Sequence, residues 1–162
     1  TWDGRKVKAN NREAGVKAIL AAHEAGYTLF DHADIYCDGV SEELFGLALR
    51  QSKALKKSSV IATKCGICIP KSNEPYRYDS SGDYIVKSCE KSLQRMGINC
   101  IDIYQLHRPD WLMDPSEVIH AFAKLKKAGK VKHFGVVHWK IWNKKGATLN
   151  ALYSFLKNRV HC

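Results

Sequence analysis

The chain of 162 residues lacks a long hydrophobic run and a recognisable targeting leader. No apolar stretch approaches the ~20 residues that a helix needs to cross a bilayer. No charged segment followed by an apolar one stands at the start, as a secretory signal would require. We therefore expect a soluble cytoplasmic protein with no membrane partner.

Acidic residues are absent from the C-terminal part of the chain. Glu117 is the last acid, and residues 121–162 hold ten basic side chains, which equals the whole net charge of +10. Such a block could bind nucleic acid or an anionic surface, or serve a phosphate-bearing cofactor. Because no nucleic-acid-binding motif accompanies it, we interpret the block as a solvated basic face. A basic nucleic-acid-binding protein is kept as an alternative.

The six cysteines show little of the spacing that is typical of metal-binding motifs. Only Cys65 and Cys68 form a C-x-x-C pair, which could be a redox dithiol or half of a zinc site. A structural zinc site needs four ligands, and no second such pair exists. The residues after Cys68 look like a loop, whereas a thioredoxin-like motif should open a helix. We therefore expect reduced thiols and no metal site.

The length allows one domain with a core, but a complete eight-stranded α/β barrel usually needs about 250 residues. Helical patterns alternate with four short apolar runs that read as strands, as in βαβ units. The expected strands are residues 27–31, 59–64, 101–107 and 131–137. Right-handed crossovers predict that they lie parallel and adjacent in this order.

The predicted fold is therefore α/β, a partial (β/α)8 TIM barrel of about four parallel strands with intervening helices. The chain starts at Thr1 without an initiator methionine, and we expect it to lack the first strand and the last three. A partial barrel leaves two sheet edges unpaired, and such edges invite self-association.

The expected helices have recognisable ends. One runs over residues 11–25 and stops at Gly26. Ser41 is the expected cap of the next. A third spans residues 83–96, and the pair Asp114-Pro115 opens a fourth. Residues 69–82 are predicted to form the longest loop.

Four side chains that can carry chemistry stand at or just after the ends of these strands: Asp31, Tyr36, Lys64 and His107. The C-terminal ends of parallel strands share the face on which an α/β barrel builds its active site. We therefore expect the four to converge, with the aspartate beside the lysine ammonium.

Each of these residues has a simpler interpretation when it is taken alone. Asp31 could cap a turn, Lys64 could be a solvated strand end, and His107 could be a buried, hydrogen-bonded histidine. Their joint occurrence at the ends of three successive strands favours a site. His32 and Asp34 are interpreted as loop residues.

The four side chains suit the reduction of a carbonyl. A phenol with a pKa near ~10 donates a proton poorly at neutral pH, and a neighbouring lysine cation favours the phenolate. An aspartate keeps the ammonium charged and aimed. A neutral imidazole can hold the carbonyl oxygen during proton transfer, while an external cofactor supplies hydride.

Four motifs, in order, resemble the aldo-keto reductase family. They are Phe30-Asp31-His32-Ala33-Asp34-Ile35-Tyr36 with residues 41–46, then Ile61-Ala62-Thr63-Lys64-Cys65-Gly66, then residues 102–110, and finally residues 129–136. The resemblance covers about residues 2–137. It implies an NAD(P)H-dependent reductase of small aldehydes or ketones.

In that family the four matching residues are catalytic. The resemblance therefore implies catalytic roles for Asp31, Tyr36, Lys64 and His107, and it implies that Asp31 also lies close to the cofactor. The sequence does not distinguish NADPH from NADH, and it does not identify the substrate.

The resemblance ends near Val137. The family usually continues with a serine–asparagine pair that holds the nicotinamide carboxamide, and here the residues are Val137 and His138. His138 is the remaining candidate for that cofactor contact and fits it loosely. We expect residues 1–137 to be a partial barrel and residues 138–162 to be a basic, helical tail unrelated to the family. A frameshift, an altered splice or a gene-model error would produce such a tail.

Weak cofactor binding follows from this departure and from the missing strands. The alternative to a working reductase is an inactive fragment of the family that acts only as a scaffold.

Overall fold

The computed structural model describes residues 9–70 and 75–137. The predicted tail over residues 138–162, and with it His138, lies outside the described residues, so both stay predictions. In the described part, no helix is long and apolar enough to cross a membrane.

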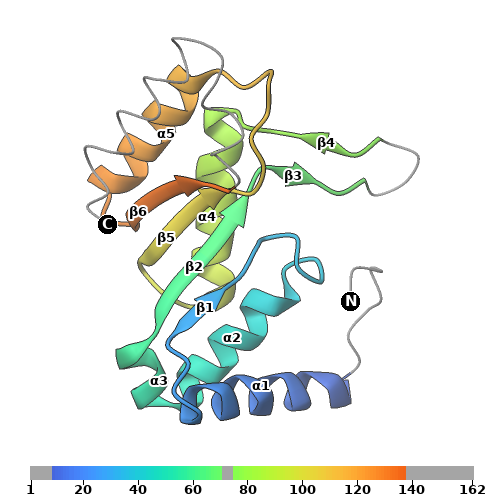
Figure 1. Ribbon diagram of the computed structural model, residues 1–162, viewed down its shortest axis with the longest axis vertical. Coiled ribbons are helices and arrows are strands. Elements are labelled where there is room, and N and C mark those ends of the chain that lie inside the picture. The colour runs from blue at the N-terminus through green and yellow to red at the C-terminus, as the bar shows by residue number, and fades with distance from the viewer. Residues whose placement is uncertain (1–8, 71–74, 138–162) are drawn as a thin grey trace.

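Figure 1 shows the helices and strands of the described chain, coloured from blue to orange along the sequence. Their order is α1 (Ala9–Glu24), β1 (Leu29–Asp31), α2 (Val40–Gln51), α3 (Lys53–Ser58), β2 (Val60–Cys65), β3 (Ile67–Cys68), β4 (Arg77–Tyr78), α4 (Gly82–Met96), β5 (Ile101–Leu106), α5 (Pro115–Lys127) and β6 (Val131–Val136).

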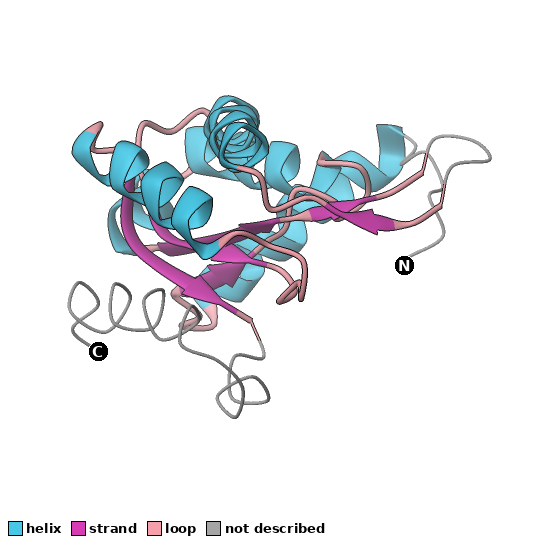
Figure 2. Cartoon of the chain, turned by 90° about the horizontal axis from the view of Figure 1, so that it is seen from above, coloured by secondary structure: helices cyan, strands magenta, loops and turns pink. Residues whose placement is uncertain are grey.

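The main sheet has the strand order β1-β2-β5-β6, and every neighbouring pair is parallel. This confirms the predicted order and direction of the four strands, whose observed ends differ from the predicted ones by at most two residues. Helices α4 and α5 cover one face of this sheet (Figure 2). The arrangement is a segment of a (β/α)8 barrel, as predicted. Self-association through open edges of the sheet stays a prediction.

The core lies between the sheet and the helices. Phe45, Tyr104 and Phe122 are among its largest fully buried side chains, and the ring of Phe122 stacks on that of Phe134 with centroids 4.4 Å apart. Full burial of one such side chain contributes on the order of 1.5–3 kcal/mol. The core therefore fixes how the helices sit on the strands, and hence where the strand ends point.

Helix α1 already includes Ala9, two residues before the predicted start at residue 11, and the short helix α3 was not predicted. The predicted caps of α5 and α2 differ in outcome. Asp114 caps α5 as predicted, since its carboxylate accepts a hydrogen bond from the Ser116 N–H at 2.8 Å. Ser41 is not a cap: α2 already begins at Val40, after Gly39 with φ 87°. A left-handed φ favours glycine, and the freed Ser41 hydroxyl lies 3.1 Å from Nδ1 of His32.

The prediction of one long loop over residues 69–82 is wrong in part. Residues Arg77–Tyr78 form β4, which pairs antiparallel with β3, and α4 already starts at Gly82. Strands of two residues are too short to show an alternating pattern, so the sequence gives no sign of this hairpin.

Candidate active site

The ammonium of Lys64 is the centre of the site. It donates hydrogen bonds to Oδ1 of Asp31 at 2.7 Å and to the carbonyl oxygen of His32 at 2.9 Å. Only 6% of the lysine side chain is exposed, whereas 53% of the Asp31 side chain is. The strand ends thus hold a buried cation next to a carboxylate that still reaches solvent.

Tyr36 and His107 complete the set. Their rings meet edge-on with centroids 5.7 Å apart, and Nζ of Lys64 lies 5.3 Å from the centroid of the Tyr36 ring. The predicted convergence of the four side chains, with Asp31 beside the ammonium, is confirmed. Their catalytic roles stay predictions.

Backbone hydrogen bonds extend the strand pairing into the segments that carry these residues. The N–H of His32 donates to the Ala62 carbonyl at 2.8 Å, and that of Asp34 donates to the Lys64 carbonyl at 3.0 Å. The N–H of His107 donates to the Cys65 carbonyl at 2.8 Å. These bonds fix the turn that carries Tyr36 against β2, so the site does not depend on a free loop.

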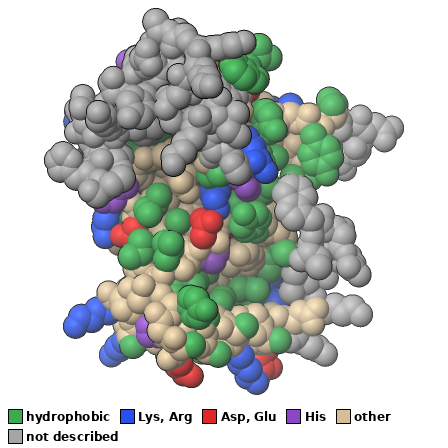
Figure 3. Space-filling model, in the orientation of Figure 1, with side chains coloured by type: hydrophobic (Ala, Val, Ile, Leu, Met, Phe, Trp, Pro, Cys, Tyr) green, Lys and Arg blue, Asp and Glu red, His purple; other side chains and the backbone are tan. Residues whose placement is uncertain are grey.

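The face of the molecule in Figure 3 shows acidic, basic and histidine side chains gathered near its middle, flanked by hydrophobic ones.

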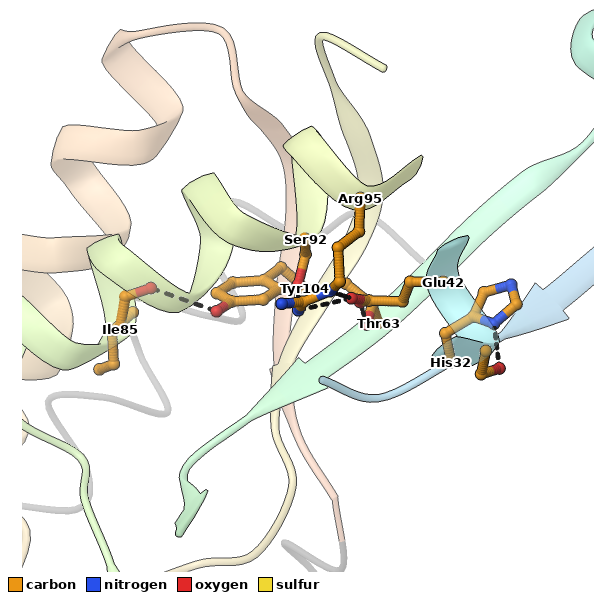
Figure 4. A network of polar contacts seen from close by, with 8 residues as sticks. His32, Glu42, Thr63, Ile85, Ser92, Arg95 and Tyr104 are labelled. Carbon is orange, nitrogen blue, oxygen red and sulfur yellow. Dashed lines mark hydrogen bonds and ion pairs between the residues drawn. The ribbon is translucent and has the colours of Figure 1, made fainter. Parts of the chain in front are cut away.

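A buried polar network lies under α2 and α4 (Figure 4). Glu42 is fully buried and accepts hydrogen bonds from Oγ1 of Thr63 at 2.5 Å and from Nε of Arg95 at 2.6 Å. Thr63 directly precedes Lys64 in β2, so its side chain points to the opposite face of the sheet. The network therefore connects α2, which follows the Tyr36 turn, with the strand that carries the lysine.

The sequence pattern does not predict this network. The alternation of β2, which sends Thr63 toward the helices, is the one signal that could have indicated a buried polar partner.

His32 and Asp34 lie in the turn after β1, outside helices and strands as interpreted from the sequence, but neither is exposed. His32 is buried, and burial lowers its pKa to about 4 despite the opposing charges of Glu42 and Asp31. Burial, followed by the charge of Glu42, raises the pKa of Asp34 to about 7. The His32 carbonyl oxygen accepts a hydrogen bond from Lys64, whereas Asp34 lines a separate cavity.

Cys65 ends β2 and Cys68 lies in β3. Burial raises the pKa of the Cys65 thiol well above its ordinary value, which disfavours the reactive thiolate. Among the described residues, no group of three or more His, Cys, Asp or Glu side chains is placed to hold a metal ion.

Comparison with known proteins identifies the family to which this chain belongs. The family model "Aldo/keto reductase family" matches residues 1–162. The chain belongs to the aldo-keto reductase family. The matched range includes residues 138–162, which were predicted to be unrelated to the family.

Relatives among curated proteins include the uncharacterized oxidoreductase YcsN of Bacillus subtilis, 44% identical over 119 residues that cover 71% of this chain and 40% of that protein. The oxidoreductase YdhF of Escherichia coli is 42% identical, with 70% of this chain and 39% of that protein covered. A 6-dehydroglucose reductase of Novosphingobium aromaticivorans is 37% identical, with 83% and 45% covered. The chain thus spans less than half the length of these relatives.

Solved structures give the same result. An aldo-keto reductase of Bacillus halodurans in its holo form has a TM-score of 0.70 at 30% identity, with 77% of this chain and 41% of that chain covered. An aldo-keto reductase of Klebsiella pneumoniae in complex with NADPH has a TM-score of 0.65 at 29% identity, with 80% and 41% covered. These similarities support the barrel assignment of the four-stranded sheet.

Proposed function

We propose that the protein reduces small aldehydes or ketones to alcohols with NADPH or NADH as the hydride donor. The observation that carries this proposal is the ion pair of Lys64 and Asp31 at 2.7 Å, with the rings of Tyr36 and His107 beside it. Family membership supports the reaction class.

Tyr36 is the proposed proton donor to the carbonyl oxygen. The Lys64 ammonium, held by Asp31, stabilises the negative charge that develops on the phenol oxygen as the proton leaves. The His107 imidazole, next to the tyrosine ring, holds the carbonyl oxygen in place. Asp31 acts through the lysine, so in the proton transfer it is a positioning residue.

A bound nicotinamide cofactor supplies the hydride. The site is compatible with such a cofactor at Asp31, because about half of that side chain is exposed beside Lys64 and a polar group can approach it. The Klebsiella pneumoniae structure in complex with NADPH supports NADPH as the donor. His138, the second proposed contact, lies outside the described residues.

The test is oxidation of NADPH in the presence of benzaldehyde. Hydride transfer requires the donor within about 3–3.5 Å of the carbonyl carbon, and this chain spans less than half of its relatives. We therefore expect slow turnover by the 162-residue chain, and recovery in a chimera that adds the remaining strands of a relative.

Tyr36→Phe in the active form separates the mechanism from the fold. Loss of the proton donor should lower kcat by about 10²-fold or more. Tyr27→Phe is the matched control, because Tyr27 is 67% exposed and lies before β1, and it should leave kcat unchanged. Equal activity of both variants would overturn the mechanism.

A further inference from the structure

A cavity of about 320 Å³ lies between the turn after β1, the β3–β4 hairpin and α4. The hairpin leaves the main sheet beside α4 (Figure 1). This volume is at the small end of the 300–1,000 Å³ or so that is usual for ligand pockets. None of the four proposed catalytic side chains lines the cavity.

One part of the cavity wall is apolar or aromatic, beside polar lining residues. Ile35 comes from the turn after β1, Ile67 and Ile69 from the hairpin and the segment behind it, and Tyr84 from α4. The Tyr84 O–H donates to the Ile67 carbonyl at 3.4 Å, which ties the helix to the hairpin. This wall suits an apolar or aromatic ligand body of limited size.

The charged groups of the lining do not cancel. Arg95 is already paired with Glu42 at 2.6 Å, and Arg77 with Asp79 at 3.1 Å. The other charged lining residues are two acids and one base: Asp34, Asp38 and Lys91. When Asp34 is ionised, the balance of these three is negative, which favours a cationic ligand over an anionic one.

Asp34 is the lining residue that most strongly indicates a cationic ligand. Its Oδ1 is buried and has no hydrogen-bond partner within the described residues, while the carboxylate group also interacts with the Ser88 side chain and the Ile35 N–H. An unpartnered buried acceptor is costly, and more so when it is charged. A ligand that brings a positive charge next to Asp34 stabilises the ionised carboxylate.

We propose that this cavity binds a small organic cation, an ammonium or amidinium group on an apolar or aromatic body. Asp34 is its counterion, and the exposed Asp38 attracts it at the mouth. The turn that carries Asp34 also carries Tyr36, so the ligand contacts the segment that places the tyrosine.

The pH dependence of binding follows from the surroundings of Asp34. The titratable and charged groups that act on Asp34, share its field or line the same cavity are Asp38, Arg77 and Lys91, then Glu42 and Arg95, which form an ion pair, and finally Tyr84, Cys65 and Tyr104. Burial raises the pKa values of the last three, so they stay neutral near pH 7. Asp34, whose pKa is about 7, is the group that changes charge there.

The experiment is an NMR titration of the 162-residue chain with three probes of equal shape: benzylamine, benzyl alcohol and benzoate. Benzylamine should bind most tightly, with amide shifts at Asp34, Ile35 and Tyr84. If only the ionised form of Asp34 binds, the affinity for benzylamine should be about tenfold higher at pH 8 than at pH 6.

Asp34→Asn keeps the shape of the side chain and should remove both the preference for the amine and its pH dependence. Glu13→Gln is the matched control, because it removes one acid from an α1 side chain that is 73% exposed. The pH dependence of benzylamine binding is measured on the wild-type chain, so it tests the proposal even if Asp34→Asn does not fold.

Three results would overturn the proposal: tighter binding of benzoate, equal binding of benzyl alcohol, or benzylamine affinity that does not rise with pH. Because binding is measured without turnover, each result is independent of the proposed reductase activity.

Discussion

Lys64 and Asp31 meet across the neighbouring strands β2 and β1, with Nζ 2.7 Å from Oδ1. The pair is asymmetric, since the ammonium is buried and the carboxylate is half exposed. A cation is therefore held out of water by one carboxylate and by the carbonyl of His32. The pair contributes to stability as well as to the proposed chemistry.

Asp31→Asn should destabilise the fold by about 1–2 kcal/mol, because a buried charge loses its counterion while the exposed side of the pair limits the loss. The free energy of unfolding in urea measures the effect. Glu24→Gln, an exposed change at the end of α1, should change this free energy by less than ~0.5 kcal/mol. Equal losses in the two variants would show that the pair is not a stabilising contact.

Two adjacent glutamates at the start of α2 provide a sharper comparison. Glu42 is fully buried against Arg95, whereas Glu43 pairs with Arg12 while both side chains are about 40% exposed. Glu42→Gln leaves Arg95 without its anion and should cost about 3 kcal/mol. Glu43→Gln should cost less than ~1 kcal/mol.

The same urea unfolding experiment measures both glutamate variants. Their order is the decisive result, because both remove one charge from the same helical turn. A loss at Glu43 that equals or exceeds the loss at Glu42 would contradict the importance of the buried network.

Local sequence signals explain why the strands and the catalytic candidates could be predicted. Apolar runs mark the strands, and parallel pairing brings their C-terminal ends to one face. Asp31 and Lys64 could therefore be placed together although 33 residues separate them. Nothing beyond the strand order was needed for that step.

The burial of Glu42 could not be predicted in the same way. Its partners Thr63 and Arg95 lie 21 and 53 residues away, and only the packing of α2 and α4 brings them together. The prediction of Ser41 as a helix cap was wrong for a related reason. Gly39 is the N-terminal cap of α2, and the Ser41 hydroxyl contacts His32 instead. The hairpin of β3 and β4 is too short to leave a pattern.

Two buried groups give opposite pH dependences of stability. Asp34 has a raised pKa of about 7 in the folded state, so the folded state holds an extra proton and stability falls as pH rises from about 4 to 7. His32 has a lowered pKa of about 4, so its contribution is lost as pH falls from about 6.5 to 4. Between about pH 4 and pH 6.5 the two effects on the free energy of unfolding offset each other.

Asp34→Asn should therefore expose the His32 effect. In this variant the free energy of unfolding should rise by on the order of 1–3 kcal/mol from pH 4.5 to pH 7, since one pKa unit corresponds to about 1.4 kcal/mol. The wild type should vary less over the same range. Urea unfolding at both pH values checks this, and a wild type that shows the same rise would contradict the role of Asp34.

The contact of α2 with α4 depends on a glycine. A Cβ added at Gly46 would lie 2.7 Å from the backbone carbonyl oxygen of Met96, and a backbone atom cannot move aside without shifting α4. Gly46→Ala should therefore destabilise the fold by about 1–3 kcal/mol, as overpacked sites do, although alanine is the better helix former.

Gly15 is the matched control for this prediction, because it also lies inside a helix, α1. A Cβ there would lie 2.8 Å from Cδ1 of Leu44, the end of a side chain that can change rotamer. Gly15→Ala should be neutral or stabilise the fold by up to ~1 kcal/mol through helix propensity. Thermal unfolding of both variants checks the pair of predictions. If Gly46→Ala is as stable as Gly15→Ala, α2 and α4 do not pack as closely as described, and the buried Glu42–Arg95 contact between these helices would be in doubt with them.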